Sequence, residues 1–204
     1  MSTELFTAFA AFAFVSSITP GPNNLMLMAS GANFGMRRTI PHALGVSIGF
    51  SLMTTLVGVG VFGLLKAYPP ILIAMRIIGA GYLLYLAFKI ATAAAPVDEN
   101  DGRASGKPFT FFQAMAFQWV NPKAWTMALT AISLYAPGNA IATIFVIAGV
   151  YCVINLPCVS AWALAGVGSR QLLKRQGALR VFNIAMAALL VVTLAPVIIG
   201  GNGF

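Results

Sequence analysis

Long apolar stretches alternate with short polar separators along this chain. The apolar stretches fall at about residues 5–34, 40–65, 69–93, 109–135, 139–168 and 178–200. A membrane-spanning helix needs about 20 predominantly apolar residues, and every stretch reaches that length. The pattern therefore predicts an all-α integral membrane protein, in which residues 1–204 form a single domain with six transmembrane helices.

The longest separator, at residues 94–108, contains five charged residues, two glycines, two prolines and one serine, a composition typical of a solvated linker. It divides the six spans into halves at about residues 5–93 and 109–200. Because each half has three spans, the second half enters the membrane from the opposite side. We therefore expect two inverted three-helix repeats joined by a cytoplasmic linker.

Proline turns interrupt the first and fourth apolar stretches near their middle, at Thr19 to Asn24 and at Asn121 to Lys123. Proline removes a backbone donor and clashes with the carbonyl one turn back, so both helices should break there. Within a membrane, broken helices are tolerated where protein or a water-filled cavity surrounds them. Matched breaks in the two halves of a transporter mark a binding site near the midplane, and we expect these two breaks to meet.

Composition supports the membrane class and excludes several others. Hydrophobic residues make up 59% of the chain and charged residues 8%, with a mean hydropathy of +0.89, whereas a soluble domain has about 25% charged residues. The net charge of +8 does not indicate nucleic acid, because the basic residues lie in short loops between spans.

Lysine and arginine are unequally divided between the two sides of the predicted membrane. Nine of them lie on the side that holds the separators after the first, third and fifth spans: Arg37, Arg38, Lys89, Arg103, Lys107, Arg170, Lys174, Arg175 and Arg180. The opposite side has Lys66 alone. Cytoplasmic loops carry the excess of basic residues, so both termini are expected outside the cytoplasm.

Lys123 is the fifteenth residue of the fourth stretch, about 21 Å along a helix. A charged group at that depth costs at least ~2.5 kcal/mol to insert, and a lysine stem reaches the interface poorly from there. The four acidic residues lie in the tail or in a loop: Glu4, Asp98, Glu99 and Asp101. We infer that Lys123 pairs with an anionic group that binds transiently, such as a substrate carboxylate. Lys123 is also a candidate for proton coupling.

Amide and hydroxyl groups beside the opened backbone complete the candidate site. The half-helix that starts near Pro22 directs its positive end inward and favours an anionic group, while unwound carbonyls favour an ammonium. A zwitterionic amino acid carries both an anionic group and an ammonium. The structural alternative is that these side chains only cap the half-helices. The candidate substrate-binding residues are Thr19, Pro20, Gly21, Pro22, Asn23, Asn24, Gln118, Asn121, Pro122 and Lys123.

Other residues are weaker candidates for a role in transport. Trp119 and Trp125 either line a cavity or pack in the core, and Gly45 and Gly49 indicate close helix packing first and gating second. His42, at the start of the second span, is either a proton-coupling residue or an interfacial one. The chain has one histidine, and its two cysteines lie together in another span, which does not favour a metal site. The sequence contains no nucleotide-binding loop. We therefore expect no cofactor and no enzymatic activity.

Three sequence blocks resemble the LysE/RhtB-type amino-acid exporter family over nearly the whole chain: Thr19–Asn23 with Ser30–Gly31, Gly35–Arg38 and Pro41–Gly45; Gly79–Leu86; and Gln118–Trp125. The resemblance implies an inner-membrane exporter of amino acids or related metabolites, driven by the proton motive force, with the translocation site at the two proline blocks. Family members that export lysine or arginine tend to carry an acidic residue near the position of Phe50–Ser51. Its absence here favours neutral substrates.

Two alternative functions remain open at this stage. A passive channel for small metabolites would show the same composition, and a membrane thiol-redox relay would need reactive cysteines on facing spans, whereas Cys152 and Cys158 share one span. Small residues on the second, third and fifth spans are compatible with a homodimer without requiring one.

Overall fold

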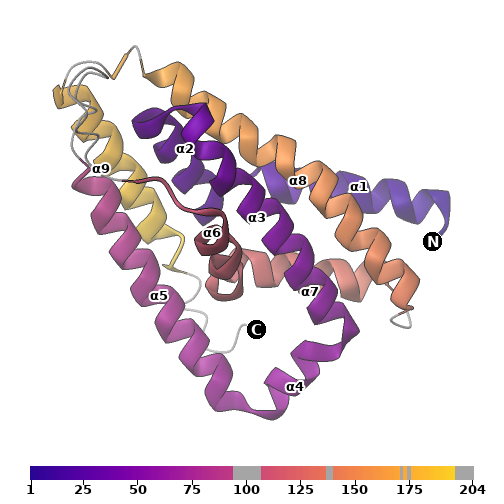
Figure 1. Cartoon of the computed structure of the whole chain (residues 1–204). Coiled ribbons are helices and arrows are strands. Elements are labelled where there is room, and N and C mark those ends of the chain that lie inside the picture. Colours follow the sequence, from indigo (N-terminus) through magenta and orange to yellow (C-terminus); the bar gives the residue numbers. More distant parts are fainter. Residues whose placement is uncertain (94–106, 137–139, 171, 174–175, 196–204) are drawn as a thin grey trace.

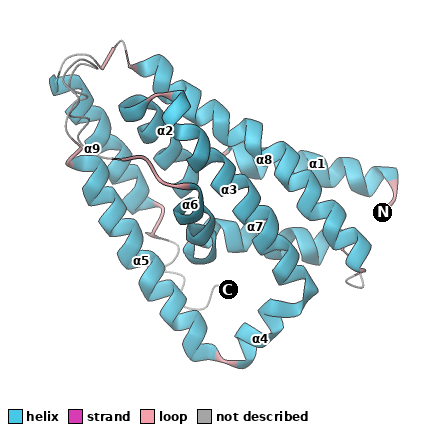
Figure 2. Ribbon diagram, viewed as in Figure 1, coloured by secondary structure: helices cyan, strands magenta, loops and turns pink. Residues whose placement is uncertain are grey.

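The computed structural model describes residues 1–93, 107–136, 140–170, 172–173 and 176–195, and all regular elements among them are helical (Figures 1 and 2). In chain order they are α1 Thr3–Ile18, α2 Pro22–Phe34, α3 Met36–Leu56, the π-helical turn η1 Val57–Val61, α4 Phe62–Ala67, α5 Pro69–Ala91, α6 Phe111–Phe117, the 3-10 turn η3 Gln118–Val120, α7 Pro122–Tyr135, α8 Ile141–Ser169 and α9 Gln176–Val192.

Three of these helical segments are long and apolar enough to cross a membrane: Met36–Leu65, Pro69–Ala91 and Ile141–Ser169. A fourth span results if α1 and α2, which are bent by 53° at their break, are taken together. The structure thus supports a helical membrane protein. The fourth and sixth predicted spans correspond to shorter helices, so the arrangement of six spans in two inverted repeats stays a prediction. Most of the predicted linker lies outside the described residues.

Helix α8 is the element around which α1, α2 and α3 pack. It contacts α1, α2 and α3 along its length, α3 also contacts α6, and α5 pairs with α9. Figure 1 shows α8 beside α1 and α3, with α5 and α9 forming a separate pair joined to α3 through α4. The α5–α9 pair meets the rest through a core that includes Leu25, Leu83 and Leu190.

Apolar side chains also cover much of the outer surface. Ile77 on α5 is 68% exposed, Val153 on α8 is 74% exposed and Val181 on α9 is 68% exposed. Contiguous exposure of large apolar groups is unfavourable in water but matches a hydrocarbon environment. These faces are the surfaces through which the chain would contact lipid.

Two glycines with positive φ lie at the start of α3 and inside η1. Gly35, with φ 78°, permits a one-residue turn between α2 and α3. Helix α3 therefore begins at Met36, before the arginine pair that the sequence placed in a loop. Gly60, with φ 111°, interrupts the helix inside η1, and no atom lies within 4 Å of the position where its Cβ would be. Gly60 thus marks a backbone break rather than a packing contact.

Candidate functional site

The two proline breaks meet, as the sequence predicted. Lys123, in the first turn of α7, extends its ammonium to the end of α1. Its Nζ donates to the Thr19 carbonyl at 2.6 Å, to the Thr19 hydroxyl at 2.9 Å and to the Pro20 carbonyl at 3.4 Å. An ammonium has three donor hydrogens, so the first break satisfies all of them with oxygen atoms.

The terminal carbonyls of α1 accept hydrogen bonds from several other elements. A helix end leaves its last four carbonyls without intrahelical partners, and these need partners away from water. Asn24 of α2 donates to the carbonyls of Ser17 at 2.8 Å and Thr19 at 2.7 Å. Trp162 of α8 donates to the Ile18 carbonyl at 2.9 Å. The end of α1 is therefore tied to α2, α7 and α8.

Asn24 should contribute measurably to stability through these bonds. In Asn24→Ala the carbonyl of Ser17 loses its side-chain donor, and an unsatisfied buried group costs about 1–3 kcal/mol. For a protein of this size we expect the apparent melting temperature to fall by about 2–12 °C, measured by thermal-shift size-exclusion chromatography in detergent. Thr126→Ala should have a smaller effect, because the Thr126 hydroxyl is exposed and bonds the Pro122 carbonyl in its own helix. Equal losses in both variants would contradict the capping role.

The second break is stabilised locally. Asn121 precedes α7 in an extended conformation, and its side-chain oxygen accepts from the backbone N–H of Lys123 at 3.2 Å. Pro122 occupies the first helical position, where its missing N–H is not needed. The indole of Trp125 donates to the Trp119 carbonyl at 2.8 Å. These contacts fix the start of α7 and thereby the direction of Lys123.

A reciprocal amide pair joins the two halves beside the breaks. Asn23 Nδ2 donates to Gln118 Oε1 at 2.8 Å, and Gln118 Nε2 donates to Asn23 Oδ1 at 3.2 Å. Gln118 Nε2 also donates to the Ala114 carbonyl at 2.8 Å, which fixes its orientation. Gln118 is fully buried. The pair therefore connects α2 with η3 directly.

A small polar chamber lies between these groups. Its described lining combines amides, hydroxyls and one ammonium with a few apolar side chains: Ser16, Ser17, Gly21, Asn23, Asn24, Phe50, Gln118, Asn121, Lys123, Ala124, Met127, Asn155 and Val159. It offers about 20 Å³ to the centre of a water-sized sphere, and one water needs about 10–15 Å³ by that measure. In this conformation the chamber has space for one or two waters and is too small for an amino acid.

The electrostatics of the chamber favour a group of negative charge beside Lys123. The helices α2 and α7 both begin at it, since Gly21 and Asn121 are their N-cap residues. A helix N-terminus carries about half a positive charge, and the Lys123 ammonium adds a full one. Among the described lining residues there is no carboxylate. The carbonyl-rich end of α1 supplies electronegative groups next to this ammonium.

Sequence reasoning missed seven of the described residues that line the chamber: Ser16, Ser17, Phe50, Ala124, Met127, Asn155 and Val159. Asn155 of α8 donates to Ser17 Oγ at 3.2 Å, and its side-chain oxygen accepts from Ser47 Oγ at 3.0 Å. It connects α1, α3 and α8 in a buried network. The signal was available, because Asn155 is the one amide within the apolar run of residues 141–169, and a polar residue inside a membrane span suggests a functional site. Phe50 lines the chamber from α3.

Several predicted residues lie elsewhere. Trp125 is 1% exposed and belongs to an apolar core with Phe9 and Tyr151, so the core-packing alternative holds for it. Trp119 is partly buried against the same core and, like Trp125, is not among the described residues that line the chamber.

Gly45 and Gly49 are packing residues in this conformation. A Cβ at Gly49 would lie 2.6 Å from Met115 Cα, and one at Gly45 would lie 2.8 Å from Ala114 Cβ. Both glycines therefore allow α3 to approach α6 closely. This confirms the first of the two interpretations, close packing, and leaves gating untested.

His42 is buried, at 1% exposed, and not interfacial as one interpretation had it. Its ring lies 5.1 Å from that of Phe109, and neither ring nitrogen has a hydrogen-bond partner within the described part of the chain. It lines a second, larger cavity rather than the chamber. No group of three metal-ligating side chains occurs among the described residues, and both cysteines are free thiols.

Comparison with known proteins decides the family. The family model for the LysE type translocator matches residues 14–199. The chain belongs to the LysE family. The resemblance found in the three sequence blocks is thereby confirmed, and this LysE-family protein is a bacterial multi-pass inner-membrane transporter and not an enzyme.

Named relatives of this LysE-family protein are efflux proteins. A cysteine/O-acetylserine efflux protein of Salmonella choleraesuis (strain SC-B67) is 34% identical over 194 residues, covering 94% of this chain and 96% of the relative. One of Escherichia coli (strain K12) is 31% identical over 193 residues, with 94% and 96% covered. One of Salmonella typhi is 32% identical over 194 residues, with 94% and 96% covered. No solved structure matches.

Proposed function

We propose that this LysE-family translocator exports small neutral amino acids or close derivatives, of the kind for which its relatives are named, in exchange for protons. The observation that carries the proposal is the contact of Lys123 with Thr19, which places one ammonium and the polar groups of both breaks around a single chamber. The Lys/Arg bias supports an orientation with both termini outside the cytoplasm.

In the proposed complex a zwitterion binds between Lys123 and the end of α1, whose contact it replaces. The carboxylate displaces oxygens from the Lys123 ammonium and also faces the N-termini of α2 and α7. The substrate ammonium takes the place of Lys123 at the Thr19 carbonyl. Phe50, Met127 and Val159 provide apolar lining for a small side chain. No carboxylate among the described lining residues could hold a cationic side chain, which supports neutral substrates.

Proton coupling through Lys123 is part of the proposal. Lys123 is the one titratable side chain among the described residues that line the chamber. A passive channel is the alternative, but the chamber of about 20 Å³ has no room for an amino acid in this conformation, which supports a carrier that changes conformation during transport. The chamber has to open before an amino acid can enter it.

The test is accumulation of radiolabelled O-acetylserine in inside-out vesicles that contain the protein. A lumen one pH unit more acidic than the outside provides about 1.36 kcal/mol per exchanged proton. We therefore expect about tenfold accumulation for one-to-one exchange, and its collapse by a protonophore. Vesicles from cells that lack the protein are the control. Equilibration without accumulation would indicate a channel, and a lack of any specific uptake would contradict this substrate class.

A further inference from the structure

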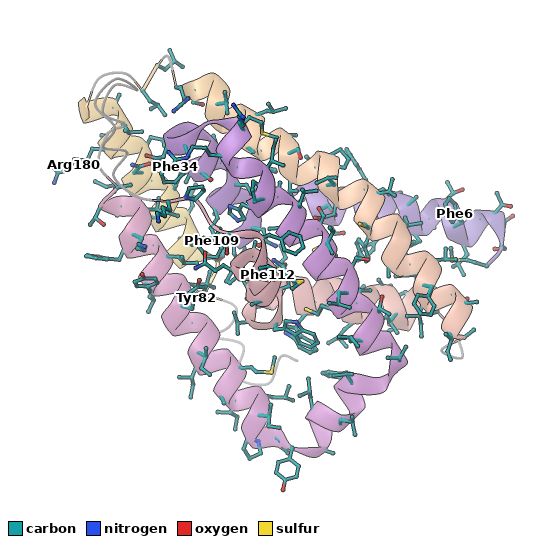
Figure 3. The ribbon with its side chains drawn as sticks, viewed as in Figure 1. Phe6, Phe34, Tyr82, Phe109, Phe112 and Arg180 are labelled. Atoms are coloured by element: carbon teal, nitrogen blue, oxygen red, sulfur yellow. The ribbon has the colours of Figure 1, made fainter. Side chains whose placement is uncertain are left out.

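A cavity larger than the chamber lies between α2, α3, α5 and the start of α6. It offers about 660 Å³ to the centre of a water-sized sphere, within the size range of small-molecule sites. Figure 3 labels Phe34, Tyr82 and Phe109, which border it from α2, α5 and the segment before α6. We refer to this space as the vestibule.

The vestibule has polar groups at both ends. Lys89 and Lys107 line its mouth, and both are exposed. His42, Ser30 and Asn33 line its interior, and all three are buried. Ser30 already bonds Thr39 at 2.9 Å, and Asn33 bonds Asn183 at 3.1 Å. His42 alone among these three has no protein partner in the described structure.

An unpartnered buried imidazole calls for an explanation, because native proteins leave few buried polar groups unsatisfied. Its desolvation is unfavourable and no protein group compensates for it. A leucine or phenylalanine would fill the same position at lower cost. A ligand in the vestibule that accepts the imidazole N–H would supply the missing partner.

The vestibule also adjoins the chamber. Met26 and Asn23 are three residues apart on α2, with Met26 lining the vestibule and Asn23 the chamber. Likewise Gln113 lines the vestibule and Gln118 the chamber. The Asn23–Gln118 amide pair is therefore located at the boundary, with the buried Phe117 ring 5.9 Å from that of Tyr82.

We propose that the vestibule is a second binding site, on the cytoplasmic side, for the carboxylate of the exported amino acid, with His42 as its inner contact and the Asn23–Gln118 pair as the barrier to the chamber. The inference rests on the proposed function and adds the route of entry. Lys89 and Lys107 attract the anion to the mouth, and His42 binds its carboxylate before the amide pair separates.

The test is protection of an introduced cysteine from labelling, so it does not require transport. Ala29→Cys in a Cys152→Ala/Cys158→Ala background places a thiol in the vestibule wall. Ala43→Cys is the matched control, since Ala43 is similarly buried, at 2% against 3% exposed, and packs in a core beside His42. A small membrane-impermeant thiosulfonate reagent is added to inside-out vesicles, with and without O-acetylserine.

We expect Ala29→Cys to be labelled, Ala43→Cys to remain unlabelled, and O-acetylserine to protect Ala29→Cys. The amide of O-acetylserine, which has no carboxylate, should protect much less. Adding His42→Leu should raise the half-protecting concentration at least about tenfold without lowering the melting temperature, and His42→Gln or His42→Asn should restore part of the protection. A melting temperature that falls in His42→Leu with unchanged protection would assign His42 a structural role and overturn the proposal.

Other outcomes also decide the matter. Labelling that O-acetylserine does not affect would overturn the site, even if vesicle uptake shows export. Protection of purified protein in detergent by phosphatidylglycerol, but not by the amino acid, would reassign the vestibule to a lipid headgroup and overturn the proposal. Protection in vesicles that show no accumulation would support the vestibule while contradicting proton-coupled export, so the two failures are distinguishable.

Discussion

Lys123→Met should reduce export at least about tenfold and as much as about a hundredfold, because hydrogen bonds to charged groups contribute about 1.5–3 kcal/mol. The substitution keeps the length and apolar character of the stem but removes the ammonium that bonds Thr19 and Pro20. The proposed carboxylate partner is lost with it. Uptake of O-acetylserine into inside-out vesicles measures the effect.

Lys123→Arg is the informative companion variant. Its guanidinium keeps the positive charge, but it does not give up a proton in proteins. If Lys123 carries the coupled proton, we expect Lys123→Arg to bind substrate and to lose accumulation against a gradient. The two variants should then differ in how uptake depends on pH. Equal activity of both at every pH would rule out proton exchange at Lys123, and wild-type uptake by Lys123→Met would remove the residue from the site.

The second large effect is expected at the contact of α2 with α8. A Cβ at Gly31 would collide with the Ala163 carbonyl, and one at Gly166 would collide with the Met28 carbonyl and lie 2.9 Å from the Ala32 nitrogen. These contacts involve backbone atoms, which cannot move away by a change of rotamer as a side chain can. Overpacking a core costs about 1–3 kcal/mol and occasionally more. Gly166→Leu should therefore yield little folded protein.

Gly168 provides a matched control on the same helix. No atom lies within 4 Å of its Cβ position, and the residue is exposed. We expect Gly168→Leu to fold with near wild-type yield, as judged by fluorescence-detected size-exclusion chromatography. Comparable yields for Gly166→Leu and Gly168→Leu would show that α2 and α8 do not approach as closely as described.

The helix breaks could be predicted from the sequence because their cause is covalent and local. Pro20, Pro22 and Pro122 cannot donate the backbone hydrogen bonds that a continuous helix requires. Lys123 could be singled out for a similar reason, since a charge deep in an apolar stretch is costly whatever surrounds it. Their meeting was predicted from the matched placement of the breaks.

The remaining residues of the chamber depend on tertiary packing. Asn155 reaches Ser17 and Ser47 because α8 packs against α1 and α3, and no pattern in residues 141–169 specifies that register. His42 was placed at an interface by its position near the start of a span, but Phe109 covers it from a segment that follows the predicted linker. The vestibule likewise forms between elements that are distant in sequence.

The end of α1 has a consequence for how the chamber opens. Its terminal carbonyls bond Asn24, Lys123 and Trp162, which come from three different helices. Displacing any one of these helices leaves a carbonyl without its donor. The cost is smallest if all the donors are exchanged in one step. Such an anchor favours a concerted, all-or-none transition between two arrangements over a gradual widening of the gap. Partly opened intermediates should accordingly be short-lived.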